Sequence, residues 1–229
     1  MTRQIVFLVY PGFQVLDAAG PLAAFEAANA CVPGAYLLEL IARDGGLVAS
    51  SGGTRLAATA FSDRAGDDTL IVTGGDGVFA AAECATTVGF VSNSGAALRR
   101  IASVCSGAYL LATAGLLHGR RATTHWRRSQ DFARRFPEVQ VDADRIFTRD
   151  GKVWTSAGIS AGIDLALALI ADDLGEAVAR QVARQLVVYY RRPGGQSQFS
   201  EMAELQPAGR RFAALLDHVG RDGVVHRVV

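Results

Sequence analysis

The sequence lacks long apolar runs, a strong net charge and paired cysteines. No apolar run in the 229-residue chain approaches the length of a membrane-spanning helix. The formal net charge is +1, so no overall field would draw the protein to nucleic acid or to a membrane surface. The three cysteines and four histidines show neither disulfide nor metal-ligand spacing, which favours a reducing compartment and argues against a metal site. The first strand-like run follows Met1 almost at once, so we expect no signal peptide and predict a cytoplasmic protein. We also predict that the protein has no cofactor.

Apolar residues are nevertheless abundant and regularly arranged. Half of the residues are hydrophobic, enough for one large domain with a substantial core. Short apolar runs typical of buried strands alternate with helical patterns, which favours a parallel sheet covered by helices on both faces. The expected strands are 5–10, 35–42, 69–73, 101–104 and 121–124, with hairpins at 47–58 and 145–155, and the expected helices are 15–30, 86–100, 106–117, 127–136, 160–173 and 176–191.

A polar stretch with Pro and Gly changes this pattern near residue 191. The string Arg191-Arg-Pro-Gly-Gly-Gln-Ser-Gln-Phe-Ser200 breaks the preceding helical pattern and is typical of a linker. We therefore expect one domain over residues 1–191, followed at 192–229 by a linker and a short amphipathic helix at 210–219.

A cysteine stands where a short apolar run ends and a helical pattern begins. Ser103, Cys105 and Gly107 follow the small-x-Cys-x-Gly pattern of a nucleophile elbow, in which small residues relieve crowding around a strand-to-helix turn. The N–H groups and dipole of the next helix favour a negative charge, so we expect a partly ionised, reactive Cys105. The alternative is that Cys105 is a small buried hydrophobe at a strand end.

Two glycines and a serine are candidates for binding negative charge opposite this thiol. Ligands of open parallel sheets bind outside the carboxyl ends of the strands. Gly74 and Gly75 follow the strand predicted at 69–73 and, with the Ser106 N–H, could form an oxyanion hole facing Cys105. An ordinary strand-to-loop turn explains the two glycines equally well.

Asp17 and His125 are candidates for moving a proton. Asp17 lies near the start of the first predicted helix, where it either complements the helix dipole or is a buried acid that points at the site. Spacing alone favours the first role. His125 follows a predicted strand end and could reach the cleft as a general base, although a histidine beside tryptophan is more often packed or hydrogen-bonded. Four nearby arginines could attract an anion, but a solvated cluster explains them more simply: Arg120, Arg121, Arg127 and Arg128.

Together these motifs resemble the ThiJ/PfpI family, within the class I glutamine amidotransferase-like superfamily. The resemblance covers about residues 3–190. It implies a three-layer α/β/α sandwich around a mostly parallel, flavodoxin-like sheet, with the cysteine on a nucleophile elbow. It also implies a homodimer.

Several strings are similar to the amino-terminal sensing domain of AraC-type regulators, in which a double helix-turn-helix domain follows the linker. Here thirty residues follow Phe199, too few for two helix-turn-helix units. We therefore expect that this chain alone does not bind DNA specifically, and that DNA contact needs a C-terminal domain not present in it. The strings are 103–112, 121–126, 155–167 and 191–199.

The same motifs are similar to isocyanide hydratases, in which an elbow thiolate attacks the isocyanide carbon and water completes an N-formamide. By this resemblance, Asp17 shares a proton with the thiol and acts as the acid. Those enzymes place Thr directly after the cysteine, whereas this chain has Ser106, which still offers a hydroxyl and an N–H. The catalytic candidates are therefore Cys105, Asp17, Ser106 and His125, and the candidates for oxyanion or ligand binding are Gly74, Gly75 and Ser106.

The linker string favours a ligand- or redox-sensing domain, because it matches the regulators and has no evident use in a hydratase. The Cys105 pocket would then bind a small molecule or report oxidation, and a cysteine-dependent hydratase or hydrolase is the alternative. Asp rather than Glu at position 17 counts against a deglycase or protease-like activity. We also expect Cys105 to be the most easily oxidised of the three thiols.

Overall fold

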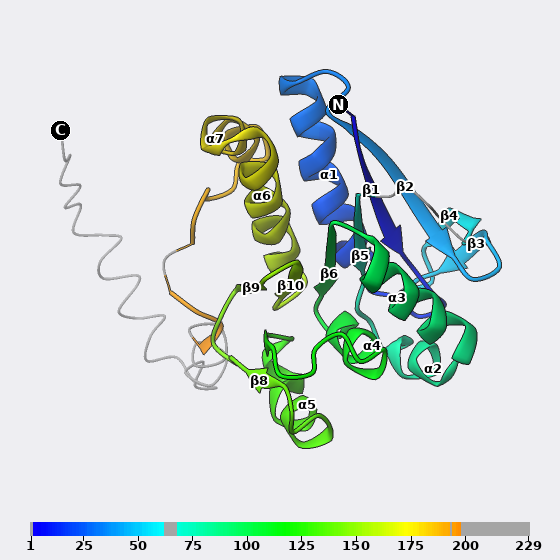
Figure 1. The fold of residues 1–229 in the computed structure, drawn as a ribbon. Helices are drawn as coiled ribbons and strands as arrows, with labels where there is room; N and C mark the ends of the chain where they lie inside the picture. Colours follow the sequence, from blue (N-terminus) through cyan, green and yellow to red (C-terminus); the bar gives the residue numbers. More distant parts are fainter. Residues whose placement is uncertain (1, 62–67, 193, 198–229) are drawn as a thin grey trace, which may run out of the picture. The chain divides into compact units, whose positions relative to one another are not determined.

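The runs predicted as buried strands form the centre of one large sheet. The computed structural model describes residues 2–61, 68–192 and 194–197. Within these ranges, eight strands pair in the order β3-β4-β2-β1-β5-β6-β10-β9 (Figure 1). The pairs from β4 to β10 are parallel, and the edge strands β3 and β9 are antiparallel to their neighbours. The strands are β1 (Arg3–Leu8), β2 (Tyr36–Ala42), β3 (Gly46–Ala49), β4 (Arg55–Ala60), β5 (Thr69–Val72), β6 (Arg100–Val104), β7 (Arg121–Ala122), β8 (Gln140–Val141), β9 (Phe147–Asp150) and β10 (Val153–Ser156).

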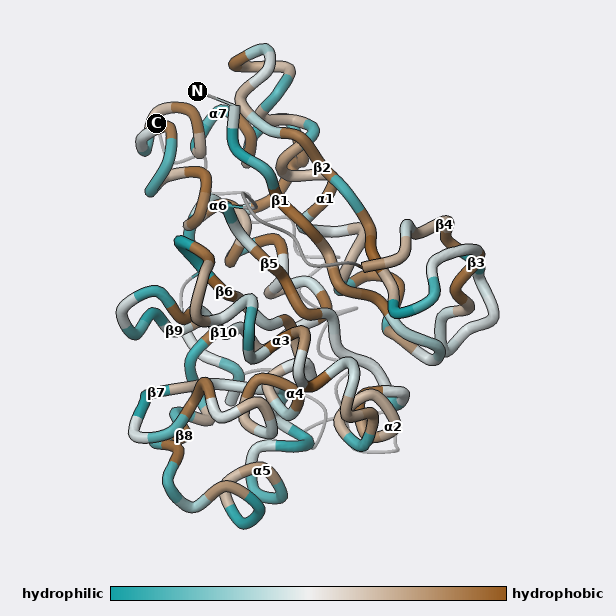
Figure 2. The backbone as a smooth tube through the Cα atoms, turned by 45° about the vertical axis from the view of Figure 1, so that its right-hand side comes forward, coloured by the Kyte–Doolittle hydropathy of each residue, from teal (hydrophilic) through white to brown (hydrophobic). Residues whose placement is uncertain are grey.

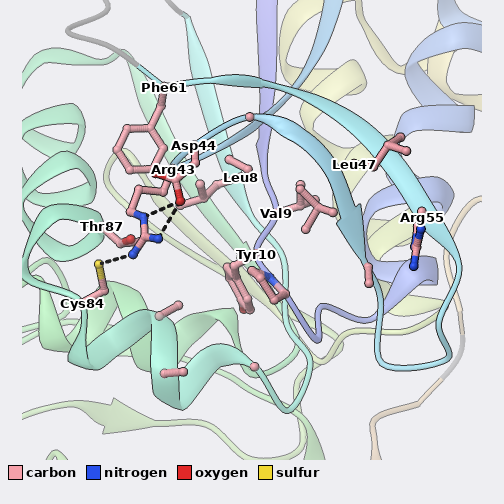
Figure 3. A pocket seen from close by; sticks show the side chains of 18 residues that line it. Leu8, Val9, Tyr10, Arg43, Asp44, Leu47, Arg55, Phe61, Cys84 and Thr87 are labelled. Carbon is pink, nitrogen blue, oxygen red and sulfur yellow. Dashed lines mark hydrogen bonds and ion pairs between the residues drawn. The ribbon is translucent and has the colours of Figure 1, made fainter.

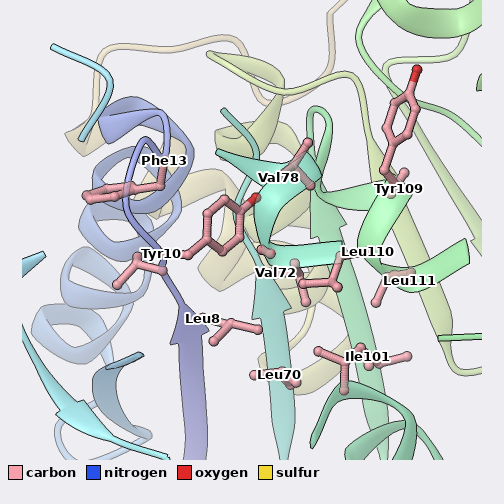
Figure 4. Packing of buried hydrophobic residues seen from close by; sticks show 14 of the residues in the cluster. Leu8, Tyr10, Phe13, Leu70, Val72, Val78, Ile101, Tyr109, Leu110 and Leu111 are labelled. Atoms are coloured by element: carbon pink, nitrogen blue, oxygen red, sulfur yellow. The ribbon is translucent and has the colours of Figure 1, made fainter. Parts of the chain in front are cut away.

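Helices cover both faces of this sheet (Figure 1). On one face α1, α6 and α7 pack against one another, and α2, α3 and α4 pack together on the other. Leu110 of α4 packs in one cluster with Leu70 of β5 and Ile101 of β6 (Figure 4). Each fully buried side chain of this kind contributes about 2 kcal/mol of stability. The helices are α1 (Val15–Cys31), α2 (Val78–Glu83), α3 (Ala85–Ala97), α4 (Gly107–Thr113), α5 (Ser129–Arg135), α6 (Ala161–Leu174) and α7 (Glu176–Gln185), with a short 3-10 helix at Trp126–Arg128.

The central strands are buried on both faces. Every residue of β5 and β6 is buried, whereas β4, close to the edge, is mostly exposed. Figure 2 shows the apolar character concentrated along β1, β5 and β6. Continuous apolar runs, rather than alternating ones, are therefore what this doubly covered sheet requires.

A buried arginine fixes the end of the sheet away from Cys105. Arg100, the first residue of β6, is 3% exposed. Its guanidinium donates to Asp173 at 2.6 Å and to Asp172 at 3.2 Å, both in α6. Its Nε also donates to Thr69 at 3.1 Å. A buried cation without such partners would cost several kcal/mol, so these contacts tie α6 to β5 and β6.

The predicted fold class is confirmed, with local differences. The order β2-β1-β5-β6-β10 is the flavodoxin-like order of a doubly wound sheet. The segment predicted to return to the sheet edge at 121–124 instead forms β7, which pairs with β8 in a separate two-stranded sheet. The helix predicted at 176–191 ends at Gln185, since Val187 adopts a left-handed conformation with φ 56°. Helix α2 was not predicted from the sequence, because it has only six residues.

The chain divides into two units, residues 1–196 and 197–229. The first unit extends past the predicted boundary at 191, so it includes the beginning of the predicted linker. The helix predicted at 210–219 lies outside the described residues. Among the helices that the structure describes, none combines the length and the apolar character needed to cross a membrane.

Candidate functional site

Cys105 lies on a sharp turn between β6 and α4. Its φ is +56°, in the left-handed region that few non-glycine residues adopt, and Gly107 begins the helix two residues later. The Cys105 N–H donates to the Ser156 carbonyl at the end of β10, at 3.0 Å. The strand–turn–helix geometry that the sequence predicted is therefore present.

Glycine is required where other backbone segments approach this turn. At Gly158, with φ +86°, an added Cβ would lie 2.1 Å from the Cβ of Cys105. At Gly74 it would lie 2.7 Å from the Cys105 Cβ and 2.7 Å from Asp17 Oδ2. The site is thus formed by segments that follow β5, β6 and β10, with no room for side chains at these two positions.

Asp17 is a buried acid that points into the site. It lies in the first turn of α1, yet its side chain is fully buried. Oδ2 accepts the Gly74 N–H at 3.0 Å and Oδ1 accepts the Ile159 N–H at 2.7 Å. Burial raises the pKa of Asp17 from 3.8 to about 6, although both amides and the Cys105 thiol act in the opposite direction. Of the two roles considered for Asp17, the geometry favours the site residue.

The surroundings of the Cys105 thiol favour its protonated form. Its side chain is buried, and burial together with the negative charge of Asp17 raises the pKa of the thiol well above its usual range. The amide and hydroxyl of Ser106 lower it by less. These surroundings act against the expected partial ionisation, because desolvation and a neighbouring carboxylate outweigh the start of the short helix α4.

Two of the three amides expected to form an oxyanion hole have partners other than the thiol. The Gly74 N–H donates to Asp17, and the Gly75 N–H donates to the Ser106 hydroxyl at 2.9 Å. That hydroxyl also donates to the Gly75 carbonyl at 3.0 Å. The structure therefore brings Gly74, Gly75 and Ser106 to the thiol as predicted, while their role in binding an oxyanion stays a prediction.

His125 contacts its own neighbours in the chain. Its Nδ1 accepts the Arg127 N–H at 3.3 Å, and its ring stacks on Trp126 with centroids 5.7 Å apart. Burial, and then the charges of Arg127 and Arg128, lower the pKa of His125. These contacts match the packed histidine considered as the alternative, and the general-base role stays a prediction.

The arginines around His125 also have local partners. Arg128 pairs with Asp76 at 3.0 Å and Arg120 with Asp150 at 3.3 Å. The Arg127 guanidinium lies 5.0 Å from the centre of the Trp126 ring. A solvated cluster accounts for them. Within the described ranges, no group of three His, Cys, Asp or Glu side chains is placed to hold a metal ion.

Three residues of the site were not singled out in the sequence. Tyr10 is buried at the end of the first apolar run, and its hydroxyl donates to the Thr73 carbonyl at 2.5 Å. Burial, and then the charges of Asp17 and Cys105, raise its pKa. Thr124 donates its hydroxyl to the Cys105 carbonyl at 2.8 Å, and Ile159 donates its amide to Asp17. Thr124 and Ile159 lie inside strings already noticed, so those strings carried the signal.

Comparison with known proteins gives a consistent family assignment. The DJ-1/PfpI family matches residues 3–172. Isonitrile hydratase of Pseudomonas putida is 38% identical over 187 residues, which are 81% of this chain and 78% of that protein. The HTH-type transcriptional regulator CdhR of Pseudomonas aeruginosa is 32% identical over 196 residues, which are 84% of this chain and 57% of the regulator.

A solved structure agrees with these sequence relatives. The crystal structure of a ThiJ/PfpI family protein from Pseudomonas syringae is 32% identical and superposes with a TM-score of 0.74, covering 84% of this chain and 77% of that one. The fold, the cysteine on its strand-to-helix turn and the matched residues lead to one conclusion: this chain belongs to the DJ-1/PfpI family.

Proposed function

We propose that this chain is the sensing domain of an AraC-type transcriptional regulator, in which the Cys105 pocket binds a small ligand or responds to oxidation. As part of this proposal the domain works in the cytoplasm as a homodimer and reaches DNA through a separate C-terminal domain. The similarity to CdhR, of which this chain spans 57%, is consistent with this arrangement. The observation that carries the proposal is the attachment of the predicted linker to the site.

Gln196 attaches the linker to one side of the site. Its side chain is 3% exposed. The Gln196 Nε2 donates to the Arg145 carbonyl at 2.8 Å, to the Thr123 hydroxyl at 3.0 Å and to the Thr124 carbonyl at 3.1 Å. Thr124 in turn donates to the Cys105 carbonyl. One residue therefore separates the linker from the backbone of the cysteine turn.

Arg192 attaches the linker to the other side. Its guanidinium pairs with Asp164 at 2.6 Å and donates to the Ser160 hydroxyl at 3.1 Å. Ser160 directly precedes α6, and the residue before it, Ile159, holds the Asp17 carboxylate through its amide. The linker thus contacts the segments that fix both members of the Cys105–Asp17 pair.

This attachment supplies a physical route from the pocket to whatever follows the linker. A ligand or an oxidised sulfur at Cys105 would shift Thr123–Thr124, which hold Gln196, and Gly158–Ile159, which directly precede Ser160, a partner of Arg192. Any change that favours one arrangement of the linker is a coupling free energy between the two sites. In an enzyme with a solvent-facing tail, the same buried glutamine would have no evident use.

A second function, isonitrile hydration, is favoured by the Asp17–Cys105 pair itself and by the hydratase relative. In this reaction the Asp17 carboxylate takes the thiol proton while the sulfur bonds to the isocyanide carbon. The proton then goes to that carbon, giving a thioimidate. Water adds to the thioimidate, the C–S bond breaks, and an N-formamide and the free thiol are released. Asp17 can act as the base because its carboxylate contacts the thiol and its raised pKa of about 6 lies near neutral pH.

Incubation with cyclohexyl isocyanide, followed by chromatographic detection of the N-formamide, separates the two functions. We expect no turnover above that of Cys105→Ala, the matched control. Turnover at about 1 per second or faster, abolished in Cys105→Ala, would replace the sensing proposal with the enzyme. In parallel, titration of DNA fragments should give weak binding that is lost on adding salt, because the proposal assigns DNA contact to a separate C-terminal domain.

A further inference from the structure

A second thiol, Cys84, lies at a cavity that Cys105 does not line. The cavity has a volume of about 510 Å³ and lies between the carboxyl end of β1, the β3–β4 hairpin and the α2–α3 segment. This volume falls in the range of small-molecule sites. Its inner wall is apolar and includes Leu8, Val9 and Tyr10 (Figure 3). The space is therefore suited to an apolar molecule of moderate size.

Polar groups are gathered at one end of this cavity. Cys84 lies between α2 and α3, and Figure 3 shows its sulfur directed toward Arg43. Arg43 Nη1 donates to the Cys84 sulfur at 3.6 Å, while its Nε and Nη2 donate to Asp44 at 2.9 and 2.6 Å. Thr87, in the first turn of α3, also lines this end.

These neighbours favour the thiolate. Interactions with the Thr87 hydroxyl and amide, and then with Arg43, lower the pKa of Cys84 to about 7. Unlike Cys105, Cys84 is only half-buried and faces a cation. A nucleophile, a positive group and an apolar chamber are thus in contact with one space.

We propose that this cavity binds an α,β-unsaturated carbonyl compound with an apolar chain and that Cys84 adds covalently to it. The apolar wall holds the chain, and the guanidinium of Arg43 lies beside the sulfur, where its remaining Nη1 hydrogen can bond to the carbonyl oxygen. The proposal is independent of the function proposed for Cys105, because neither Cys84 nor Arg43 belongs to that site.

The addition balances without an oxidant or a leaving group. The Cys84 sulfur forms a bond to the β-carbon, and the π electrons of the C=C bond move through the α-carbon to the carbonyl oxygen as an enolate. The enolate takes up one proton from water at the α-carbon, replacing the proton that the thiol released on ionisation. The product is a saturated carbonyl thioether.

The test compares trans-2-octenal with acrolein on the full chain. Adducts are located by peptide mass spectrometry, and the rates are divided by those of glutathione with the same two aldehydes. We expect Cys84 to react first, and its octenal-to-acrolein ratio to exceed that of glutathione by about tenfold, because burial of part of the chain adds binding energy. Cys31, half-buried at the end of α1, is the internal control and should show the glutathione ratio.

Two variants show whether Cys84 and the cavity cause the preference for octenal. Cys84→Ser should abolish the preferred adduct. Ala80→Leu, on the exposed face of α2 where it lines the cavity, keeps the thiol and Arg43 but fills part of the chamber. It should return the octenal-to-acrolein ratio of Cys84 to the glutathione value. The proposal is overturned if octenal modifies Cys31 as fast as Cys84, or if the ratio at Cys84 is unchanged by Ala80→Leu.

Discussion

Cys105 and Cys84 both lie at the start of a helix, yet the pKa values of their thiols are shifted in opposite directions. Cys105 precedes α4, is buried and contacts a carboxylate, so its pKa is raised. Cys84 precedes α3, is half-buried and contacts Thr87 and a guanidinium, so its pKa is lowered to about 7. Groups at the helix start lower the pKa of both thiols, but at Cys105 burial and the charge of Asp17 outweigh them.

Substitutions that crowd the Cys105 turn should lower the free energy of unfolding more than any other change considered. Gly158→Ala should lower the free energy of unfolding by about 3 kcal/mol or more, because the new Cβ meets Cys105 at 2.1 Å and φ is +86°. Gly34→Ala is the matched control, with φ +74° and open space around it, and should cost about 1 kcal/mol. Urea unfolding of both variants measures the difference. Equal losses would show that strain alone matters and that the turn is not closely packed.

Asp17 should make stability depend on pH. Its pKa is raised from 3.8 to about 6 in the folded protein, so the folded state binds the proton more tightly than the unfolded state. The contribution is therefore favourable below pH 4 and is lost as the pH rises from about 4 to about 6. The loss amounts to at most about 3 kcal/mol, since one pKa unit corresponds to about 1.4 kcal/mol.

Unfolding curves of the parent and of Asp17→Asn across this pH range measure that contribution. The stability difference, parent minus variant, should fall with rising pH and then become constant. A difference that stays flat from pH 4 to pH 6 would mean that Asp17 titrates normally.

The two thiols should also differ in alkylation by iodoacetamide, followed at peptide level. The rate at Cys84 should reach half its maximum near pH 7, where its thiolate is half formed. At pH 7 we expect Cys84 to react at least about tenfold faster than Cys105, whose thiol is buried and has a raised pKa. Faster alkylation of Cys105 would agree with the reactivity expected from the sequence and would show that the two pKa values are not shifted in opposite directions.

A smaller effect is expected when the cation beside Cys84 is removed. Arg43→Gln should shift the Cys84 alkylation profile to higher pH and slow the reaction at pH 7 by about threefold, because the thiolate loses a positive neighbour. Arg55→Gln removes a cation that lines the same cavity, at a distance from Cys84 in Figure 3, and is the control. A shift of equal size in both variants would point to a general loss of charge instead of the Arg43 contact.

The sequence predicts the layers of this fold better than the chemistry of its site. Apolar runs such as Thr69–Val72 and the cysteine turn are local patterns, so the sheet, its covering helices and the position of Cys105 follow from them. The ionisation of Cys105 depends on Asp17, which lies 88 residues away in the chain (105 − 17) and approaches it only in the folded state. Dipole and spacing arguments contain no information on that approach.

The contacts of the linker could not be predicted from the sequence for a similar reason. Pro and Gly in the string after Arg191 predict that the helix ends there, whereas α7 already ends at Gln185, and composition does not show that Gln196 is buried. Its partners Thr123, Thr124 and Arg145 come from a different part of the chain. A polar segment that looks like a free linker is therefore partly built into the domain.

Coupling between the linker and the cysteine turn can be measured directly. Gln196→Ala removes the contacts to Thr123 and Thr124, while Arg191→Ala removes an exposed pair with Glu176 that lies outside the site. The observable is the iodoacetamide rate at Cys105 divided by the rate at Cys84 in the same molecule. We predict that this ratio rises about fivefold in Gln196→Ala, because losing buried hydrogen bonds of about 1 kcal/mol loosens the turn, and is unchanged in Arg191→Ala. An unchanged ratio in Gln196→Ala would show that the linker and the cysteine turn are not coupled.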